Sequence, residues 1–272
     1  MEAMARVLRD GAFEGETHIV TGAAQGIGNA VATMLAEHGA QVVLVDLDPS
    51  RLEEAAQEMA RVASVSPIAH AANVTDEAQV QQAVGAALDA TGSIHGVVNV
   101  AGITKDARIA KKSYDDFKAV LAVHLHGTFL FTREVAAQHW HPLFKANGNE
   151  PLDDGVNRFV LNFSSVSARN GNVGQVDYTA AKGAIESVTK TTAREFSSYR
   201  ARVNAIAPGP VNTPMLEAVG EAGIAAMGRA TLTGRIAEPE QMAAVICALA
   251  DPLISGYITG QVLQVNGGMY LA

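Results

Sequence analysis

A glycine-rich turn near the start of the chain restricts its fold more than any other feature. Residues His18 to Thr21 (HIVT) have the composition of a short buried strand, and GAAQGIG follows directly. From Ile27 onward, apolar residues recur at the spacing of one helix face. A strand, a glycine turn and a helix in this order suit a phosphate, because backbone N–H groups at the helix N-terminus point at the anion.

The glycines of this turn are Gly22, Gly26 and Gly28, spaced G-x-x-x-G-x-G. The turn alone fits a nucleotide site and an ordinary strand-to-helix connection equally well. The next strand, QVVLVD, ends on Asp46, about 20 positions after the glycines, where a carboxylate can accept hydrogen bonds from the adenosine ribose. A 2′-phosphate there would be repelled by roughly 1 to 4 kcal/mol, so NAD is favoured over NADP. Arg51 is long enough to reach such a phosphate, but we interpret it as a solvated residue in the first turn of the following helix.

Tyr178, Lys182 and Ser165 supply the residue types of a proton-transfer site. In YTAAK (178–182) the lysine follows the tyrosine by one helical turn, so the two side chains share a helix face. A tyrosine has a pKa of about 10, and a nearby cation lowers it by about 1 to 3. We therefore expect Lys182 to bring the pKa of Tyr178 toward the range of general acid and base catalysis. The alternative is a solvated helix pair without a chemical role.

Apolar strands alternate with helical patterns along the whole chain. This alternation predicts an α/β fold: a doubly wound, mostly parallel seven-stranded sheet with helices on both faces, the Rossmann fold. We expect an N-terminal extension over 1–12, one domain over 13–272, and a substrate lid at about 209–235. The expected strands lie near 17–21, 41–46, 65–72, 94–100, 157–164, 202–207 and 261–265.

Composition excludes several classes of function. The 272 residues are 48% hydrophobic and include one cysteine, Cys247, which we expect to be an inert buried thiol. A net charge of −8 argues against nucleic acid as a partner. The first twelve residues do not resemble a signal peptide and no stretch is long enough to span a bilayer, so we expect a cytoplasmic protein. The histidines lack the ligand spacing of a metal site, and we expect no metal.

Six ordered motifs resemble the short-chain dehydrogenase/reductase family, and the resemblance runs from Phe13 to Met269. They are TGAAQGIG (21–28), VNVAG (98–102), Ser165, YTAAK (178–182), PGPVNTPM (208–215) and GRIAEPEQ to ITGQVLQVNGGM (234–269). The resemblance is close to the branch that contains 3-oxoacyl-carrier-protein reductases and 3-hydroxyacyl-CoA dehydrogenases. Six motifs at compatible spacings are far more specific than any one of them.

The resemblance implies a role for each matching residue. Ser165 would polarise the substrate carbonyl, Tyr178 would transfer the proton, and Lys182 would lower the tyrosine pKa and hold the nicotinamide ribose. Asn73 would approach the adenine, Asn99 would pass beneath the cofactor, and Val211 would contact the nicotinamide carboxamide. The full set expected to bind NAD is Thr21, Gly22, Gln25, Gly26, Ile27, Gly28, Asp46, Leu47, Asn73, Val74, Asn99, Ala101, Gly102, Tyr178, Lys182, Pro208, Gly209, Val211 and Thr213.

Two positions depart from the family pattern. Val100 replaces the second asparagine of the VNVAG segment, which puts a local backbone support in doubt. In VHLHGTF, His124 stands where the family has the asparagine that helps relay protons to the lysine. An imidazole with a pKa near 6.5 can also relay a proton, so we count His124 among the catalytic residues. Histidine here resembles the hydroxyacyl-CoA dehydrogenase part of peroxisomal multifunctional enzymes. The alternative is a packing histidine.

These observations predict an NAD-dependent dehydrogenase that interconverts a secondary alcohol and a ketone, with a 3-hydroxyacyl thioester as one candidate substrate. The alternatives are an NADPH-dependent 3-oxoacyl reductase of fatty-acid synthesis and a catalytically weak NAD-binding regulatory protein. Small residues at Ala180, Gly183, Ser187 and Thr191 form one stripe of a helix and predict a homodimer or homotetramer. The segment 145–157 is expected to be a solvated loop at the amino end of the catalytic strand.

Overall fold

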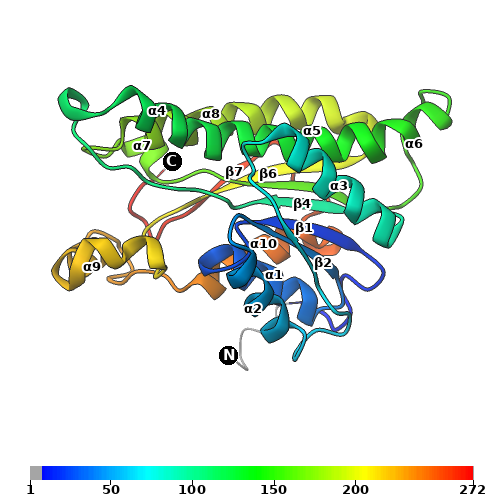
Figure 1. The fold of residues 1–272 in the computed structure, drawn as a ribbon, viewed down its shortest axis with the longest axis horizontal. Helices are drawn as coiled ribbons and strands as arrows, with labels where there is room; N and C mark the ends of the chain where they lie inside the picture. Colours follow the sequence, from blue (N-terminus) through cyan, green and yellow to red (C-terminus); the bar gives the residue numbers. More distant parts are fainter. Residues whose placement is uncertain (1–7, 272) are drawn as a thin grey trace.

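Seven parallel strands form one sheet in the order β3-β2-β1-β4-β5-β6-β7 (Figure 1). The computed structural model describes residues 8–271, and all neighbouring strands within them pair in parallel. The predicted fold class is therefore confirmed, and each strand lies where the apolar pattern indicated. The strands are β1 (Thr17–Thr21), β2 (Gln41–Asp46), β3 (Ile68–Ala71), β4 (Gly96–Asn99), β5 (Arg158–Phe163), β6 (Ala201–Pro208) and β7 (Val262–Val265).

Helices cover both faces of this sheet. In Figure 1, α1, α2 and α10 lie below it, and α3, α4, α5 and α8 lie above it. The α-helices are α1 (Gly26–Glu37), α2 (Pro49–Met59), α3 (Glu77–Thr91), α4 (Tyr114–Leu121), α5 (Gly127–Val135), α6 (His141–Ala146), α7 (Ser167–Asn170), α8 (Val176–Glu195), α9 (Gly220–Arg229), α10 (Pro239–Ala250) and α11 (Pro252–Ser255). Shorter helical segments are η1 (Ile109–Lys111), η4 (Phe196–Tyr199) and η5 (Pro214–Val219), with π-helical turns η2 (Ala122–His126) and η3 (Ala136–Trp140).

The strand order reverses at β1, which lies between β2 on one side and β4 on the other. The chain leaves β1 and β4 in opposite directions, which opens a crevice at the carboxyl ends of these strands. The loops after β1, β2, β4, β5 and β6 all begin at this edge. The fold therefore gathers the glycine turn, the VNVAG segment and the catalytic helix at one end of the sheet.

Two apolar clusters fill the space between the layers. One joins the sheet to α1, α2 and α10 through side chains such as Leu35, Leu161 and Ile246. The other joins the sheet to α3, α5 and η4 around Trp140. Phe13 and Leu8 belong to the first cluster, so the described part of the expected N-terminal extension packs on the core, while residues 1–7 lie outside the described residues.

The segment 145–157 is mostly exposed, as a solvated loop should be, but one apolar residue and two ion pairs attach it to the domain. Leu152 is buried, and its backbone N–H donates to the Ser198 carbonyl at 3.0 Å. Ion pairs join Asp153 to Arg200 at 2.5 Å and Asp154 to Arg158 at 2.6 Å. These contacts fasten the segment to η4, to the residue that precedes β6 and to the start of β5. Its expected position at the amino end of β5 is correct.

Two further expectations concern the periphery. Residues 214–229 fold into η5 and α9, which extend beyond the sheet next to the end of β6 in Figure 1, so the expected lid has its own helices. Whether it moves stays a prediction. Among residues 8–271, the helices are too short or too polar for one to cross a membrane.

Candidate active site

The glycine turn after β1 is built for close backbone approach. Gly22 has a φ of +67°, and a Cβ added there would lie 2.9 Å from the Ala101 Cα. A Cβ at Gly28 would lie 2.0 Å from the Gly22 carbonyl oxygen, inside van der Waals contact. These positions therefore require glycine, and the open cradle that results fits a pyrophosphate against the N-terminus of α1.

Thr21 joins this turn to the VNVAG segment. Its hydroxyl oxygen accepts hydrogen bonds from the backbone N–H groups of Val100 at 3.1 Å and Ala101 at 3.2 Å. The backbone that follows β4 is therefore held without the second asparagine of the family pattern. The 208–213 segment reaches the same turn, since a Cβ at Gly26 would lie 3.4 Å from the Thr213 Cγ2.

Asp46 lies at the tip of β2 beside the turn, as predicted. One carboxylate oxygen accepts from the Ala24 N–H at 3.0 Å and the other from the Leu47 N–H at 2.7 Å, which leaves each oxygen further acceptor capacity for a ribose hydroxyl. The Arg51 guanidinium donates to the Gln25 side-chain oxygen at 3.0 Å. The Arg51 side chain is 61% exposed, as expected of a solvated helix residue, and it also reaches Gln25 of the glycine turn.

Two of the residues expected to bind NAD have side chains occupied elsewhere. The Asn99 amide donates to Asn162 at 2.9 Å and to Thr132 at 3.2 Å, so it links β4 to β5 and α5 inside the protein. The Asn73 oxygen accepts from the Thr75 N–H and hydroxyl, which closes a local turn. These two bonds occupy the Asn99 amide N–H groups, whereas its Oδ1 is buried without a hydrogen-bond partner among the described residues.

The catalytic residues expected from the sequence come together at the carboxyl end of β5. Ser165 follows that strand, and its hydroxyl accepts from the Ser167 N–H at 3.1 Å. Tyr178 and Lys182 lie in the first turns of α8, with the lysine Nζ 5.6 Å from the centre of the tyrosine ring. The Lys182 ammonium donates to the Phe163 carbonyl at 2.6 Å, which fixes it at the strand end.

The electrostatics of this pair differ from the expectation. Burial raises the pKa of Tyr178, although the Ser165 hydroxyl lowers it, and the Asp106 carboxylate raises it further. Burial also lowers the pKa of Lys182, to about 7. The prediction that Lys182 lowers the tyrosine pKa is therefore wrong for the protein alone. Removing water disfavours both charged forms, and the ammonium is directed at a carbonyl rather than at the phenol.

His124 lies in the π-helical turn between α4 and α5 and contacts the catalytic tyrosine. Its ring meets Tyr178 edge to face, with centroids 5.1 Å apart. Nε2 lies 2.8 Å from the Ile103 carbonyl oxygen and 3.1 Å from the Ile103 nitrogen, so it donates to the carbonyl or accepts from the N–H according to its tautomer, and the buried Nδ1 has no hydrogen-bond partner within residues 8–271. Burial and the neighbouring Lys182 lower the pKa of His124 to about 3. The imidazole is therefore neutral at physiological pH, and the neutral-range pKa assumed for a proton relay is not found.

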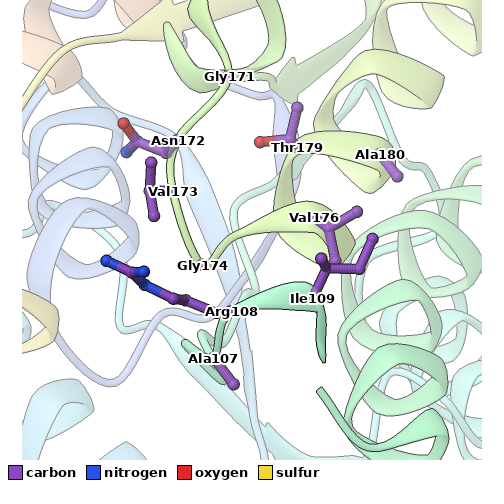
Figure 2. Close-up of a pocket in the computed structure, with 10 residues that line it drawn as sticks. All are labelled: Ala107, Arg108, Ile109, Gly171, Asn172, Val173, Gly174, Val176, Thr179 and Ala180. Atoms are coloured by element: carbon purple, nitrogen blue, oxygen red, sulfur yellow. The ribbon is translucent and has the colours of Figure 1, made fainter. Parts of the chain in front are cut away.

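A cavity of about 690 Å³ lies beside the first turn of α8. Figure 2 shows the side chains of Ala107, Arg108 and Ile109 on one wall and Asn172, Val173 and Val176 on the other. Most of this lining is apolar, and Arg108 is its cation. Lys112 and Asp177, near the same loops, form a buried ion pair at 2.7 Å. The sequence did not reveal this pair, because a lysine in a polar segment usually points into water.

The fold and this site define a nicotinamide-dependent oxidoreductase that acts on an alcohol or a ketone, and comparison with known proteins agrees. A family model described as enoyl-(acyl carrier protein) reductase matches residues 22–270. The 3-oxoacyl-(acyl-carrier-protein) reductase FabG of Thermotoga maritima is 36% identical over 95% of this chain and 99% of its own length. Human (3R)-3-hydroxyacyl-CoA dehydrogenase is 34% identical over 93% of this chain and 95% of its own.

A solved structure extends the comparison to three dimensions. The 3-ketoacyl-(acyl-carrier-protein) reductase of Brucella melitensis, complexed with NADH, has a TM-score of 0.82 and 32% identity over 95% of this chain and all of its own. The chain belongs to the short-chain dehydrogenase/reductase family.

Proposed function

We propose that the protein is an NAD(H)-dependent enzyme that interconverts a 3-oxoacyl thioester and the corresponding 3-hydroxyacyl thioester. The observation that carries this proposal is the convergence of Ser165, Tyr178 and Lys182 on the edge that holds the glycine turn and Asp46. The activities named for the FabG relative and for the human dehydrogenase support the thioester class. The largely apolar cavity beside α8 is compatible with an acyl chain.

The residues of the site have separate tasks in this reaction. When bound, the nicotinamide cofactor supplies the hydride in one direction and accepts it in the other. The Ser165 hydroxyl donates a hydrogen bond to the substrate carbonyl oxygen, which polarises it. The Tyr178 hydroxyl gives a proton to that oxygen during reduction and removes it during oxidation. Lys182 would hold the nicotinamide ribose of a bound cofactor, and Asp46 would hold its adenosine ribose.

The raised pKa of Tyr178 supports reduction as the favoured direction near neutral pH. A phenol that keeps its proton at pH 7 can donate it to a ketone, whereas oxidation of an alcohol needs the phenolate. We therefore propose that oxidation accelerates more than reduction as the pH rises above neutrality.

Arg51 favours one alternative, an NADPH-dependent 3-oxoacyl reductase. Its guanidinium lies on Gln25 of the glycine turn, and this type of group binds a phosphate with strong hydrogen bonds. Asp46 and Asp48 oppose a 2′-phosphate there, and the Arg51 side chain lies 3.7 Å from the Asp48 carboxylate that partly neutralises it. We therefore retain NAD(H) as the proposed cofactor.

The test is turnover of a panel of 3-oxoacyl-CoA and 3-oxoacyl-carrier-protein substrates with NADH and with NADPH, with ketosteroids and ketoses as comparisons. We expect thioesters to react and the other classes to be at least about tenfold poorer in kcat/KM. Equal turnover of a steroid or a sugar would refute the substrate class. Binding of NADH without turnover of any compound would instead support a regulatory protein.

We also propose that the protein forms a homodimer or homotetramer. The stripe at Ala180, Ser187 and Thr191 faces solvent in the single chain, while Ala181 and Ile185 on the opposite face of α8 are buried. Small side chains permit close approach of a second helix. Sedimentation of the wild type and of a variant with Ala180→Arg would test this: a monomer in the wild type would refute the proposal.

A further inference from the structure

The first turn of the catalytic helix carries a charge pair that the reaction does not use. The Lys112 ammonium lies 2.7 Å from the Asp177 carboxylate, and the two side chains are 4% and 1% exposed. The other Asp177 oxygen accepts from the Tyr178 N–H at 2.9 Å. Asp177 is thus bonded both to a lysine from the loop after β4 and to the backbone of the catalytic tyrosine.

Lys112 also closes its own loop. Its ammonium donates a second hydrogen bond to the Lys105 carbonyl, so the two ends of the segment 105–112 meet at one nitrogen. The same segment is bonded to the chain before α8 at two more places. The Ala107 N–H donates to the Gly174 carbonyl at 3.0 Å, and the Gln175 amide donates to both Asp106 oxygens at 3.1 and 3.2 Å.

These bonds hold the two walls of the cavity at a fixed separation. One wall is the segment 107–109 and the other is 171–176, with Thr179 and Ala180 of α8 nearby (Figure 2). Lys112 and Asp177 are the buried, charged members of this set of contacts. The first N–H groups of a helix have no partner within the helix, so the Tyr178 N–H depends on the Asp177 side chain for its bond.

We propose that Lys112 and Asp177 are a positioning pair, which holds the loop 105–112 against the first turn of α8 and thereby sets the place of the Tyr178 hydroxyl and of the adjacent cavity wall. Burying two charges costs much of what their attraction returns, so such a pair is weak evidence for stability alone. A fixed geometry at the reacting group is a benefit that repays this cost, since small displacements of a catalytic group reduce rates greatly. The inference uses the proposed role of Tyr178 but does not depend on which thioester reacts.

The charges of Lys112 and Asp177 also affect the titration of Tyr178. This effect distinguishes a pair that positions the tyrosine from a pair that only stabilises the fold. Tyr178 faces Lys182 on its own helix, His124 from the π-helical turn, Ser165 after β5 and Asp106 in the loop. To this set Lys112 and Asp177 add opposite charges that cancel. Removing the lysine leaves an unpaired carboxylate beside Tyr178, and removing the carboxylate leaves an unpaired ammonium. The two single variants should therefore move the tyrosine titration in opposite directions.

The experiment compares Lys112→Met, Asp177→Asn, the double variant and Lys118→Met. The last removes an exposed pair with Asp115, whose side chains are 55% and 91% exposed, and serves as the matched control. Hydrogen exchange at the Tyr178 and Ala107 amides reports the geometry without any substrate. The pH dependence of kcat, KM and the dissociation constant of NADH report the consequences for the site.

We expect each single variant to lose at least about tenfold in kcat at unchanged NADH affinity, with faster exchange at both amides. In the direction of ketone reduction, kcat falls at alkaline pH as Tyr178 loses its proton. The pH of this fall should rise by about one unit in Lys112→Met, where an unpaired carboxylate raises the tyrosine pKa, and drop by about one unit in Asp177→Asn, where an unpaired ammonium lowers it. The double variant, which is neutral and similar in volume, should return to within about threefold of wild type, because it leaves no buried charge unpaired. Lys118→Met should match wild type.

Three results would overturn the inference. The first is a folded single variant with wild-type kcat and exchange but a lower melting temperature. The second is a shift of this alkaline fall of kcat in the same direction in both single variants. The third is a folded double variant whose kcat lies more than about threefold below that of wild type, a comparison that needs neither single variant and so remains decisive if they fail to fold. A wild type that reduces no thioester would refute the proposed function, and the exchange measurements would still test the pair.

Discussion

The nucleotide side of the site and the catalytic side are built by different means. Around Gly22 and Gly28 the decisive feature is the absence of side chains, which leaves backbone N–H groups open at the start of α1. Around Tyr178 the decisive features are buried side chains contributed by four separate segments, and burial alters the pKa values of three of them. A backbone cradle follows from a short local motif, whereas the charge state of a buried cluster depends on the whole fold.

Removing the tyrosine hydroxyl should separate the two sides most sharply. Tyr178→Phe keeps the ring and its contact with His124 but removes the group that transfers the proton. We expect turnover to fall by about two to four orders of magnitude, with the NADH dissociation constant changed less than about threefold. Steady-state kinetics and fluorescence titration of NADH measure the two effects. Near-normal turnover in this variant would contradict the proposed proton path.

The buried Lys182 should lower the free energy of unfolding of the protein at neutral pH, and this loss should disappear as the pH becomes alkaline. Its pKa is lowered from about 10.5 to about 7 in the folded protein, so between these values the unfolded chain binds more protons than the folded one. Stability due to this group therefore rises with pH across that window, by at most about 1.4 kcal/mol for each pH unit. Below pH 7 the full cost remains.

Comparison with Lys182→Met isolates this effect, because methionine is similar in length and carries no charge. Without added cofactor, the melting temperature of the wild type minus that of the variant should increase as the pH rises from 7 to 10. The absolute difference also contains the lost hydrogen bond to Phe163, so the slope is the quantity to measure. A difference that stays constant over this range would show that the pKa of Lys182 is not lowered.

Sequence patterns predicted the parts of the molecule that rest on local periodicity. The strands, the glycine turn, Asp46 at the tip of β2 and the meeting of Ser165 with Tyr178 and Lys182 were all expected. The patterns failed where a polar residue is buried by distant segments. Lys112 and Leu152 lie in polar stretches that suggest solvent, and the Asn99 side chain turned to Asn162 through strand pairing.

The nucleotide side should discriminate between cofactors by about one order of magnitude. We expect NADH to bind at least about tenfold more tightly than NADPH, a difference of about 1.4 kcal/mol. Asp46→Ala should narrow this gap, because Arg51 on Gln25 then lacks an opposing carboxylate at the tip of β2. Adding Arg51→Ala to the Asp46→Ala variant should restore the difference in affinity between NADH and NADPH, mainly by weakening the binding of NADPH. Equal affinities for the two cofactors in the wild type would refute the assignment.

The smallest effect should come from His124, and it decides whether the catalytic side contains a proton relay. A pKa of about 3 keeps the imidazole neutral from pH 6 to 10, and its contact with Ile103 gives it a fixed position against Tyr178. His124→Asn retains an amide that can bond to the Ile103 N–H or carbonyl, whereas His124→Leu removes the bond to the Ile103 backbone at a cost of about 1 to 3 kcal/mol in stability. We therefore expect turnover to fall in the order wild type, His124→Asn and His124→Leu, with less than about a tenfold difference between wild type and His124→Leu.

Because the histidine does not titrate in this range, the ratio of wild-type to variant turnover should be constant from pH 6 to 10, and the loss of turnover should follow the loss in melting temperature. A stable His124→Leu variant that loses more than tenfold, with a ratio that changes with pH, would establish His124 as a proton relay despite its burial.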